Sequence, residues 1–193
     1  MAQSIGSKKV RTAVFISGTG SNLKSLIKFS KLKKSPISIN IIISNNPKAK
    51  GLNYSKIYKI KKKIFNFKKK TFAEKKILKT LKKDKISLIC LAGFMRILSK
   101  NFIKDFKGII LNIHPSLLPK FKGLNTHARA IDNKEKYSGC TVHYVNSKLD
   151  SGQIIIQKKV RIKNNETPKT LEKKILAQEH KLYPKAILKI FNL

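Results

Sequence analysis

Residues 10–29 read V-R-T-A-V-F-I-S-G-T-G-S-N-L-K-S-L-I-K-F, and this stretch predicts a strand, a tight turn and a helix in succession. Residues 10–17 are mostly apolar or β-branched, which is typical of a buried strand. Two glycines follow, and Leu23, Leu26 and Ile27 then recur at helical spacing. A strand that leads directly into a helix is the unit from which parallel α/β sheets are built.

The turn itself, G-T-G-S-N at residues 18–22, is a candidate phosphate site. Glycines let the backbone approach a phosphate, and the helix start offers free N–H groups and a favourable dipole. The spacing is not that of a dinucleotide-binding loop, because Leu23 stands where a third glycine would be, and the Lys-Ser/Thr pair of an ATP-binding loop is missing from its place. The turn therefore favours a monophosphate, with a plain strand-to-helix turn as the alternative.

The whole chain predicts a single α/β domain over residues 1–193, with a Rossmann-like, mainly parallel central sheet and helices on both faces. Two strand-like runs lie close together late in the sequence, so the C-terminal part of the sheet is expected to be antiparallel. A last helix should begin at Thr167-Pro168 and kink at Pro184. Further strands are expected at 37–44, 64–67, 87–92, 108–113, 139–145 and 153–162, and further helices at about 47–60 and at 71–84, the latter with Thr71 and Glu74 as a capping box.

The charge balance is extreme, with 44 basic residues, nine acidic residues and a net charge of +35. Such a charge suggests nucleic acid as a partner. However, only four of the basic residues are arginines, and the lysines are spread along the whole chain. Lys, Ile, Asn and Phe are codon choices of an A/T-rich genome, so we interpret the charge mainly as genome bias and expect no nucleic-acid partner. The positive field would still attract anionic substrates.

The composition also indicates the cellular compartment of the protein and whether it binds a metal. No stretch approaches the roughly 18–20 apolar residues of a membrane span, and the first residues lack the apolar middle of a signal peptide. We therefore expect a cytoplasmic protein without a membrane partner, either a monomer or a homodimer. Cys90 and Cys140 are expected to be buried thiols rather than a disulfide. The histidines and cysteines are scattered, so no metal site is expected.

Residues 111–118, L-N-I-H-P-S-L-L, end a predicted strand with an amide and an imidazole. Two residues apart in a strand share a face, so Asn112 and His114 should point the same way at the carboxyl end, where open α/β sheets bind ligands. Such a pair could supply an acid or base and a donor to an oxyanion, or be merely a histidine with satisfied hydrogen bonds. Asp150 gains a role only if it meets His114, and His143 is expected to fill a core or sheet-face position.

Seven stretches together resemble the folate-dependent formyltransferases, most nearly the branch that formylates glycinamide ribonucleotide. The resemblance extends over residues 12–184, and so many motifs in one order are highly specific. The stretches are I-S-G-T-G-S-N-L (16–23), L-A-G-F-M-R-I-L-S (91–99), L-N-I-H-P-S-L-L-P-K-F-K-G-L (111–124), T-H-A-R-A-I (126–131), T-V-H-Y-V (141–145), L-D-S-G (149–152) and Q-E-H (178–180).

The resemblance implies that the formyl group of 10-formyltetrahydrofolate, as co-substrate, moves to the terminal amine of glycinamide ribonucleotide in purine biosynthesis, without a metal. It implies that Asn112 and a protonated His114 stabilise the tetrahedral oxyanion, while Asp150 holds His114 charged and helps to position a water that relays the proton. The implied ribonucleotide-binding residues are Gly20, Ser21, Asn22 and Glu179. The implied folate-binding residues are Lys70, Met95, Arg96, Ile97, Leu98, Asn112, Asn146, Ser147, Lys148, Leu149 and Asp150.

The chain also departs from the family pattern, which affects the expected affinity more than the expected activity. Lys70 stands near the place where the family often has an arginine for the folate glutamate tail, and a lysine offers a point charge instead of a fork. The other departures are Lys122 for a frequent proline, Asn125 for a frequent histidine, Ser151 for a frequent glycine, and Leu176 for a polar residue.

Three alternatives remain at this stage. Methionyl-tRNA formyltransferases share the Asn-His-Asp set but carry an additional C-terminal domain and lack the G-x-G-S-N-L turn. Formyltetrahydrofolate hydrolases carry an N-terminal regulatory domain, for which we expect no room because the first predicted strand begins near residue 10. The third alternative is a basic nucleic-acid-binding module on a formyltransferase scaffold that has lost turnover.

Overall fold

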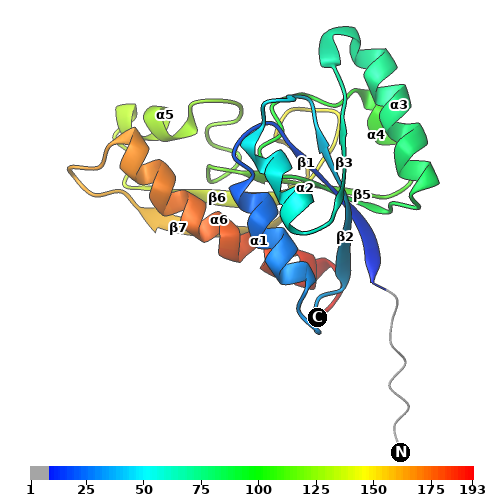
Figure 1. Ribbon diagram of the computed structural model, residues 1–193. Coiled ribbons are helices and arrows are strands. Elements are labelled where there is room, and N and C mark those ends of the chain that lie inside the picture. Colours follow the sequence, from blue (N-terminus) through cyan, green and yellow to red (C-terminus); the bar gives the residue numbers. More distant parts are fainter. Residues whose placement is uncertain (1–8) are drawn as a thin grey trace, which may run out of the picture.

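The computed structural model describes residues 9–193, in which seven strands form one sheet (Figure 1). The strand order is β3-β2-β1-β4-β5-β6-β7. Neighbours from β3 to β5 are parallel, whereas β6 and β7 are antiparallel, which confirms the predicted sheet. The strands are β1 Val10–Ile16, β2 Ile37–Ser44, β3 Lys61–Ile64, β4 Leu88–Leu91, β5 Ile109–His114, β6 Tyr137–Tyr144 and β7 Ile154–Arg161.

Helices cover both faces of the sheet, because alternate side chains of each strand point to opposite sides (Figure 1). Along β1, Val14 and Ile16 enter one apolar cluster, with α1, α2 and α6. Ala13 and Phe15 enter the other cluster, with α3 and α4. Helix α5 packs beside α6. The helices are α1 Ser21–Ser30, α2 Asn53–Ile57, α3 Lys70–Lys83, α4 Lys100–Asp105, α5 Thr126–Asp132 and α6 Pro168–Ile190.

The direction of strand addition reverses at β1. The chain places β2 and β3 on one side of β1, and then β4 and β5 on the other side. Ligands of open α/β sheets bind in the crevice at such a reversal, beyond the carboxyl ends of the strands. The two segments that leave the sheet there are joined, because the backbone N–H of Ser17 donates to the carbonyl of Gly93 at 3.0 Å and that of Met95 donates to the Ser17 hydroxyl at 2.8 Å.

Two predicted elements lie elsewhere than expected. Strand β3 is Lys61–Ile64, not 64–67, because Phe67–Lys69 forms a 3-10 turn capped by Asn66. The side chains of β3 are all exposed, so this lysine-rich edge strand shows no alternation of apolar and polar residues. The helix expected at about 47–60 is shorter, with a 3-10 turn at Lys50–Leu52 leading into α2.

The predicted capping box of α3 is wrong. The helix begins at Lys70 without a side-chain cap, so Thr71 already lies inside it. The Glu74 carboxylate instead accepts hydrogen bonds from the backbone N–H of Ser99 at 2.8 Å and from its hydroxyl at 2.6 Å. Because Ser99 caps α4, Glu74 ties α3 to α4 across 25 residues of sequence.

The last helix begins as predicted. The Thr167 hydroxyl accepts from the backbone N–H of Thr170 at 3.2 Å, and Pro168 occupies the first helical position. Helix α6 continues through Pro184 to Ile190, because buried side chains on both sides of the proline hold it against the sheet. Helices α4 and α5 were not expected, since each is shorter than two full turns and shows little periodicity.

Candidate active site

Strand β5 places Asn112 and His114 on one face at its carboxyl end, as predicted. The ring of His114 is buried, and its Nε2 lies 2.9 Å from the carbonyl oxygen of Phe121. Because a carbonyl only accepts, Nε2 carries a proton there. The other ring nitrogen, Nδ1, lies 3.4 Å from Oδ2 of Asp150. The expected meeting of His114 and Asp150 therefore occurs.

Asp150 lies at the centre of the polar cluster. Its Oδ2 accepts from the backbone N–H of Gly123 at 2.9 Å, and its Oδ1 lies 3.4 Å from the side-chain amide of Asn112. The loop reaches this position by packing closely against β6. A Cβ at Gly152 would lie 1.6 Å from the carbonyl oxygen of Tyr144, so only glycine fits there.

His143 belongs to the same cluster. The antiparallel register of β5 and β6 pairs Asn112 with His143, and the amide nitrogen of Asn112 lies 3.2 Å from Nε2 of the ring. The Nδ1 of His143 donates to the carbonyl of Tyr144 at 2.8 Å, which leaves Nε2 as the acceptor for Asn112. Burial lowers the pKa of His143 below its usual 6.5, which favours this neutral form, although the nearby Asp150 opposes that shift.

The glycine turn after β1 is built for close backbone packing. Gly20 has a φ of 73°, and a Cβ there would lie 2.7 Å from the Cα of Gly51. Gly20 also occupies the N-cap of α1 without a side-chain cap, so Ser21 starts a helix whose first N–H groups have no such partner. These groups could bind an anion.

Helix α6 brings Glu179 to this turn, 157 residues away in sequence. The amide nitrogen of Asn22 donates to the Glu179 carboxylate at 2.7 Å, and both side chains are buried. Burial raises the pKa of Glu179 to about 7, and the hydrogen bond from Asn22 acts in the opposite direction. The amide oxygen of Asn22 is buried and has no hydrogen-bond partner within residues 9–193.

A second group of predicted residues forms an apolar rim beyond β4. Met95 and Ile97 expose 61% and 60% of their surface, whereas Leu98 is buried beside α4. On the opposite loop, Leu149 is exposed and lies near Gly123, the residue that binds Asp150. Exposed apolar side chains of this size often mark a surface that binds a ligand.

The remaining predicted folate residues are at the surface. Asn146 shapes the loop before Asp150, because its amide oxygen accepts from the backbone N–H of Lys148 at 3.0 Å and its nitrogen donates to the carbonyl of Ser151 at 3.1 Å. Lys70 is exposed at the first position of α3. Arg96, Ser147 and Lys148 are also exposed. The structure does not bring these four side chains into the polar cluster.

The comparisons with known proteins show the family of the chain. The formyl transferase family pattern matches residues 10–187. The chain belongs to this family. It is 40% identical over 183 residues to the phosphoribosylglycinamide formyltransferase of Haemophilus influenzae, which covers 92% of this chain and 85% of that protein. The crystal structure of phosphoribosylglycinamide formyltransferase from Brucella melitensis has a TM-score of 0.89 and 43% identity, covering 95% of this chain and 96% of that chain.

A longer member of the formyl transferase family is also similar. The chain is 42% identical over 183 residues to the trifunctional purine biosynthetic protein adenosine-3 of Homo sapiens, covering 93% of this chain. It spans only 18% of the length of that protein.

His143 is buried on β6, in the sheet position expected for it, but its contact with Asn112 was not foreseen. The signal that could have found it is the pairing register, which sets His143 directly opposite Asn112. Residues 9–193 contain no group of three His, Cys, Asp or Glu side chains that could hold a metal ion. No helix in this part of the chain is long and apolar enough to cross a membrane.

Proposed function

We propose that this formyl transferase moves the formyl group of 10-formyltetrahydrofolate to the amine of glycinamide ribonucleotide. The observation that carries the proposal is the convergence of Asn112, His114 and Asp150 at the carboxyl end of β5. The similarity to phosphoribosylglycinamide formyltransferases over more than nine-tenths of the chain supports this substrate pair.

In the proposed reaction, the neutral amine attacks the formyl carbon, and the carbonyl oxygen becomes an oxyanion. The ring of His114 donates a hydrogen bond to it. The amide of Asn112 keeps one N–H on His143 and exchanges its longer contact with Asp150, 3.4 Å, for the oxyanion. Loss of one such donor typically costs about 3–4 kcal/mol of transition-state stabilisation. The bond between the formyl carbon and the folate nitrogen then breaks, and the proton of the attacking amine passes to that nitrogen through a water positioned by Asp150.

The contacts of His114 indicate how a substrate would enter. Its Nε2 donates to the carbonyl of Phe121. In the proposed reaction the formyl oxygen has to replace this carbonyl as the acceptor. Phe121 has a φ of 55° and lies in the left-handed region, which is unfavourable for an aromatic residue. We infer that the segment around Phe121 moves away when the formyl group binds, so that Nε2 turns its proton toward the substrate.

The two substrates would bind on either side of this cluster. The ribonucleotide phosphate binds the start of α1 at Gly20 and Ser21, and Asn22 with Glu179 binds the ribose side. The folate ring lies on the apolar rim of Met95 and Ile97, with the loop from Asn146 to Asp150 on its other side. Lys70 attracts the glutamate tail by charge alone.

A formyl-transfer assay tests the proposal directly. Purified protein is mixed with 10-formyltetrahydrofolate and glycinamide ribonucleotide, and the folate product is followed by absorbance. We expect turnover that requires the ribonucleotide. Controls contain no acceptor or charged initiator tRNA, because the net charge of +35 would suit tRNA. Activity with tRNA or water, but not with the ribonucleotide, would contradict the proposed acceptor.

A further inference from the structure

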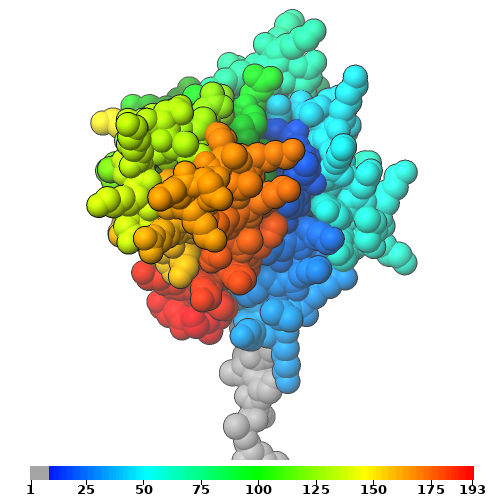
Figure 2. All heavy atoms as spheres, turned by 90° about the vertical axis from the view of Figure 1, so that its left-hand side faces the viewer, coloured from blue at the N-terminus to red at the C-terminus, as the bar shows by residue number. Residues whose placement is uncertain are grey.

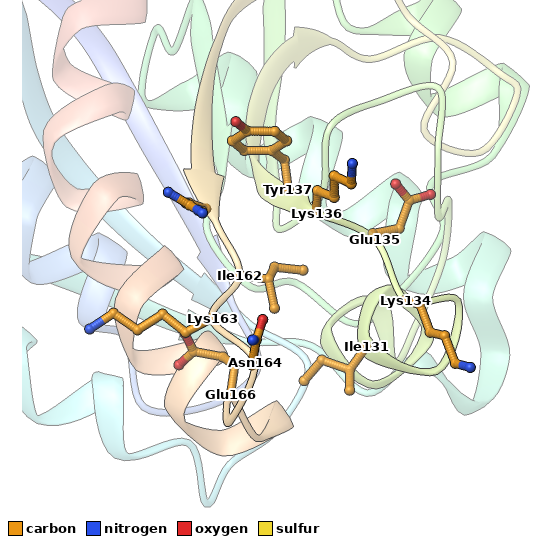
Figure 3. A pocket seen from close by; sticks show the side chains of 10 residues that line it. Ile131, Lys134, Glu135, Lys136, Tyr137, Ile162, Lys163, Asn164 and Glu166 are labelled. Carbon is orange, nitrogen blue, oxygen red and sulfur yellow. The ribbon is translucent and has the colours of Figure 1, made fainter.

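A cavity of about 550 Å³ opens between the end of α5, the start of β6 and the segment that joins β7 to α6 (Figure 3). The parts of the chain around it lie side by side on one face, α5 in yellow-green and the start of α6 in orange (Figure 2). Tyr137 opens β6 at this end, whereas His143 lies six residues further along, roughly 20 Å away. The cavity is therefore separate from the proposed formyl-transfer site.

Four cationic side chains border the cavity: Lys134, Lys136, Arg161 and Lys163. Figure 3 labels the three lysines. Within residues 9–193, none of the four makes an ion pair. They come from two neighbouring chain segments at the same end of the β6–β7 pair, where the backbone N–H of Ile162 donates to the carbonyl of Lys136 at 3.1 Å. The four positive charges therefore lie around one cavity without a carboxylate partner. Such a cavity favours a ligand that carries several negative charges.

The two carboxylates of the cavity do not cancel this charge. Glu135 is paired at 2.6 Å with Lys120, which lines a neighbouring depression and not this cavity. Glu166 is paired with Lys174, a residue of α6 that does not line the cavity. Each carboxylate is thus neutralised by a lysine from outside, and the four cations remain in excess.

The cavity also offers apolar and aromatic surface. Ile131 and Ile162 line its inner wall, and Tyr137 is exposed over 42% of its surface at one end (Figure 3). The ammonium of Lys159 lies 3.8 Å from the centroid of the Tyr137 ring. Because Lys159 lines a neighbouring depression and not this cavity, the ring has a second side that a planar ligand can contact.

We propose that this cavity binds a nucleoside phosphate, with the base against Tyr137 and the phosphates on the four cationic side chains. The volume lies in the range of sites for ligands of this size. Aromatic side chains stack on any base, and arginine binds phosphate with two parallel hydrogen bonds. A base and a phosphate are present both in a free nucleotide and at the end of an RNA strand. The experiment below distinguishes these two ligands.

Isothermal titration of the full chain with ADP, tripolyphosphate and a ten-residue oligoadenylate tests the site. We expect ADP to bind at least about 10-fold more weakly to a cavity variant, and within about 2-fold of normal to a control variant with the same net charge. An equal loss in both variants would overturn the proposal, because bulk charge would then explain the binding. The cavity variant is Lys134→Gln/Lys136→Gln/Lys163→Gln, and the control, on α3 across the sheet, is Lys75→Gln/Lys79→Gln/Lys82→Gln.

The role of the ring is tested separately. Tyr137→Leu should weaken ADP binding by about 5-fold or more and leave tripolyphosphate binding unchanged. Equal affinity of the normal chain for ADP and tripolyphosphate would overturn base recognition. Tight oligoadenylate binding that is lost in the cavity variant supports the site and identifies an RNA strand as the source. If ADP still binds the cavity variant but no longer binds Asn22→Ala, then ADP binds at the glycine turn. That result would overturn the proposal.

Discussion

The side-chain amide of Asn112 donates to Nε2 of His143 at 3.2 Å, because the antiparallel register of β5 and β6 sets the two residues directly opposite each other. The same amide nitrogen lies 3.4 Å from Asp150. Asn112 is therefore oriented from two sides, by a neutral ring and by a carboxylate. This arrangement makes His143 a positioning residue for the proposed oxyanion donor.

Replacement of His143 should reduce turnover through Asn112. His143→Ala removes the acceptor, and we expect kcat to fall about 10- to 100-fold while the KM of either substrate changes little. His143→Gln keeps an acceptor and should recover a large part of kcat. Steady-state kinetics of both variants distinguish positioning from a merely structural role, in which Gln and Ala would lose stability and activity together.

Low pH should also reduce kcat in the unmodified protein. The pKa of His143 is lowered below 6.5 by burial, so the ring is neutral at pH 7 and becomes protonated only below 6.5. A protonated ring cannot accept from Asn112, so kcat should fall as the pH decreases through the lowered pKa. The pH profile of His143→Gln, which has no proton to gain there, should lack this part of the decline.

Asp150→Asn should leave the fold intact and lower kcat by at least about 10³-fold, because the neutral amide has no negative charge to stabilise a charged His114 and offers one acceptor oxygen where the carboxylate offers two. Turnover is measured by folate absorbance, and folding by thermal unfolding. Asp105→Asn, an exposed change of the same kind at the end of α4, is the matched control. Near-normal turnover of Asp150→Asn would contradict its proposed role.

Asn22→Ala should act mainly on ribonucleotide binding. The change removes the donor to Glu179 and the unpaired amide oxygen at the start of α1, so we expect the ribonucleotide KM to rise about 10-fold and the folate KM to stay the same. Initial rates at varied ribonucleotide concentration measure this effect. Asn53→Ala, at the exposed start of α2, should leave both constants unchanged, and an unaltered ribonucleotide KM in Asn22→Ala would argue against the phosphate turn.

Glu179 should make stability depend on pH. Its pKa is raised from 4.5 to about 7 in the folded chain, so the folded state holds a proton that the unfolded state loses between these values. The stabilisation is fully present below pH 4.5 and is lost as the pH rises through about 7. Relative to Glu179→Gln, the free energy of unfolding should fall by about 3 kcal/mol over this window. Urea titrations at several pH values measure it.

The control for this prediction lies on another helix. Asp105 is exposed at the end of α4, so Asp105→Asn should change the free energy of unfolding little between pH 4.5 and 7. A difference between normal protein and Glu179→Gln that stays flat from pH 4.5 to 7 would show that Glu179 ionises in the folded state as it does in water.

Glu74→Ala should destabilise the fold by about 2 kcal/mol, because the backbone N–H and hydroxyl of Ser99 lose a shared carboxylate acceptor. Chemical denaturation measures the change. Lys75→Ala, the exposed neighbour on α3, should cost less than about 0.5 kcal/mol. Equal effects of the two changes would show that Glu74 does not hold α4 in place.

Elements with strong local patterns could be placed from the sequence alone. The strand, glycine turn and helix at residues 10–30 and the strand Ile37–Ser44 lie where apolar periodicity predicts them, because a buried strand or helix face needs a repeating set of apolar side chains. Local spacing also sufficed for Asn112 and His114, since residues two apart in a strand share a face whatever surrounds them. The resemblance to formyltransferases was carried by these same motifs.

The tertiary structure alone decided which distant residues meet. His143 joins the site through the register of β5 and β6, and Glu74 binds Ser99 instead of capping its own helix. Strand β3 has only exposed side chains, so its pairing with β2 leaves no trace in the apolar pattern. Register, loop closure and helix docking depend on packing between segments far apart in the chain, and no local periodicity encodes them.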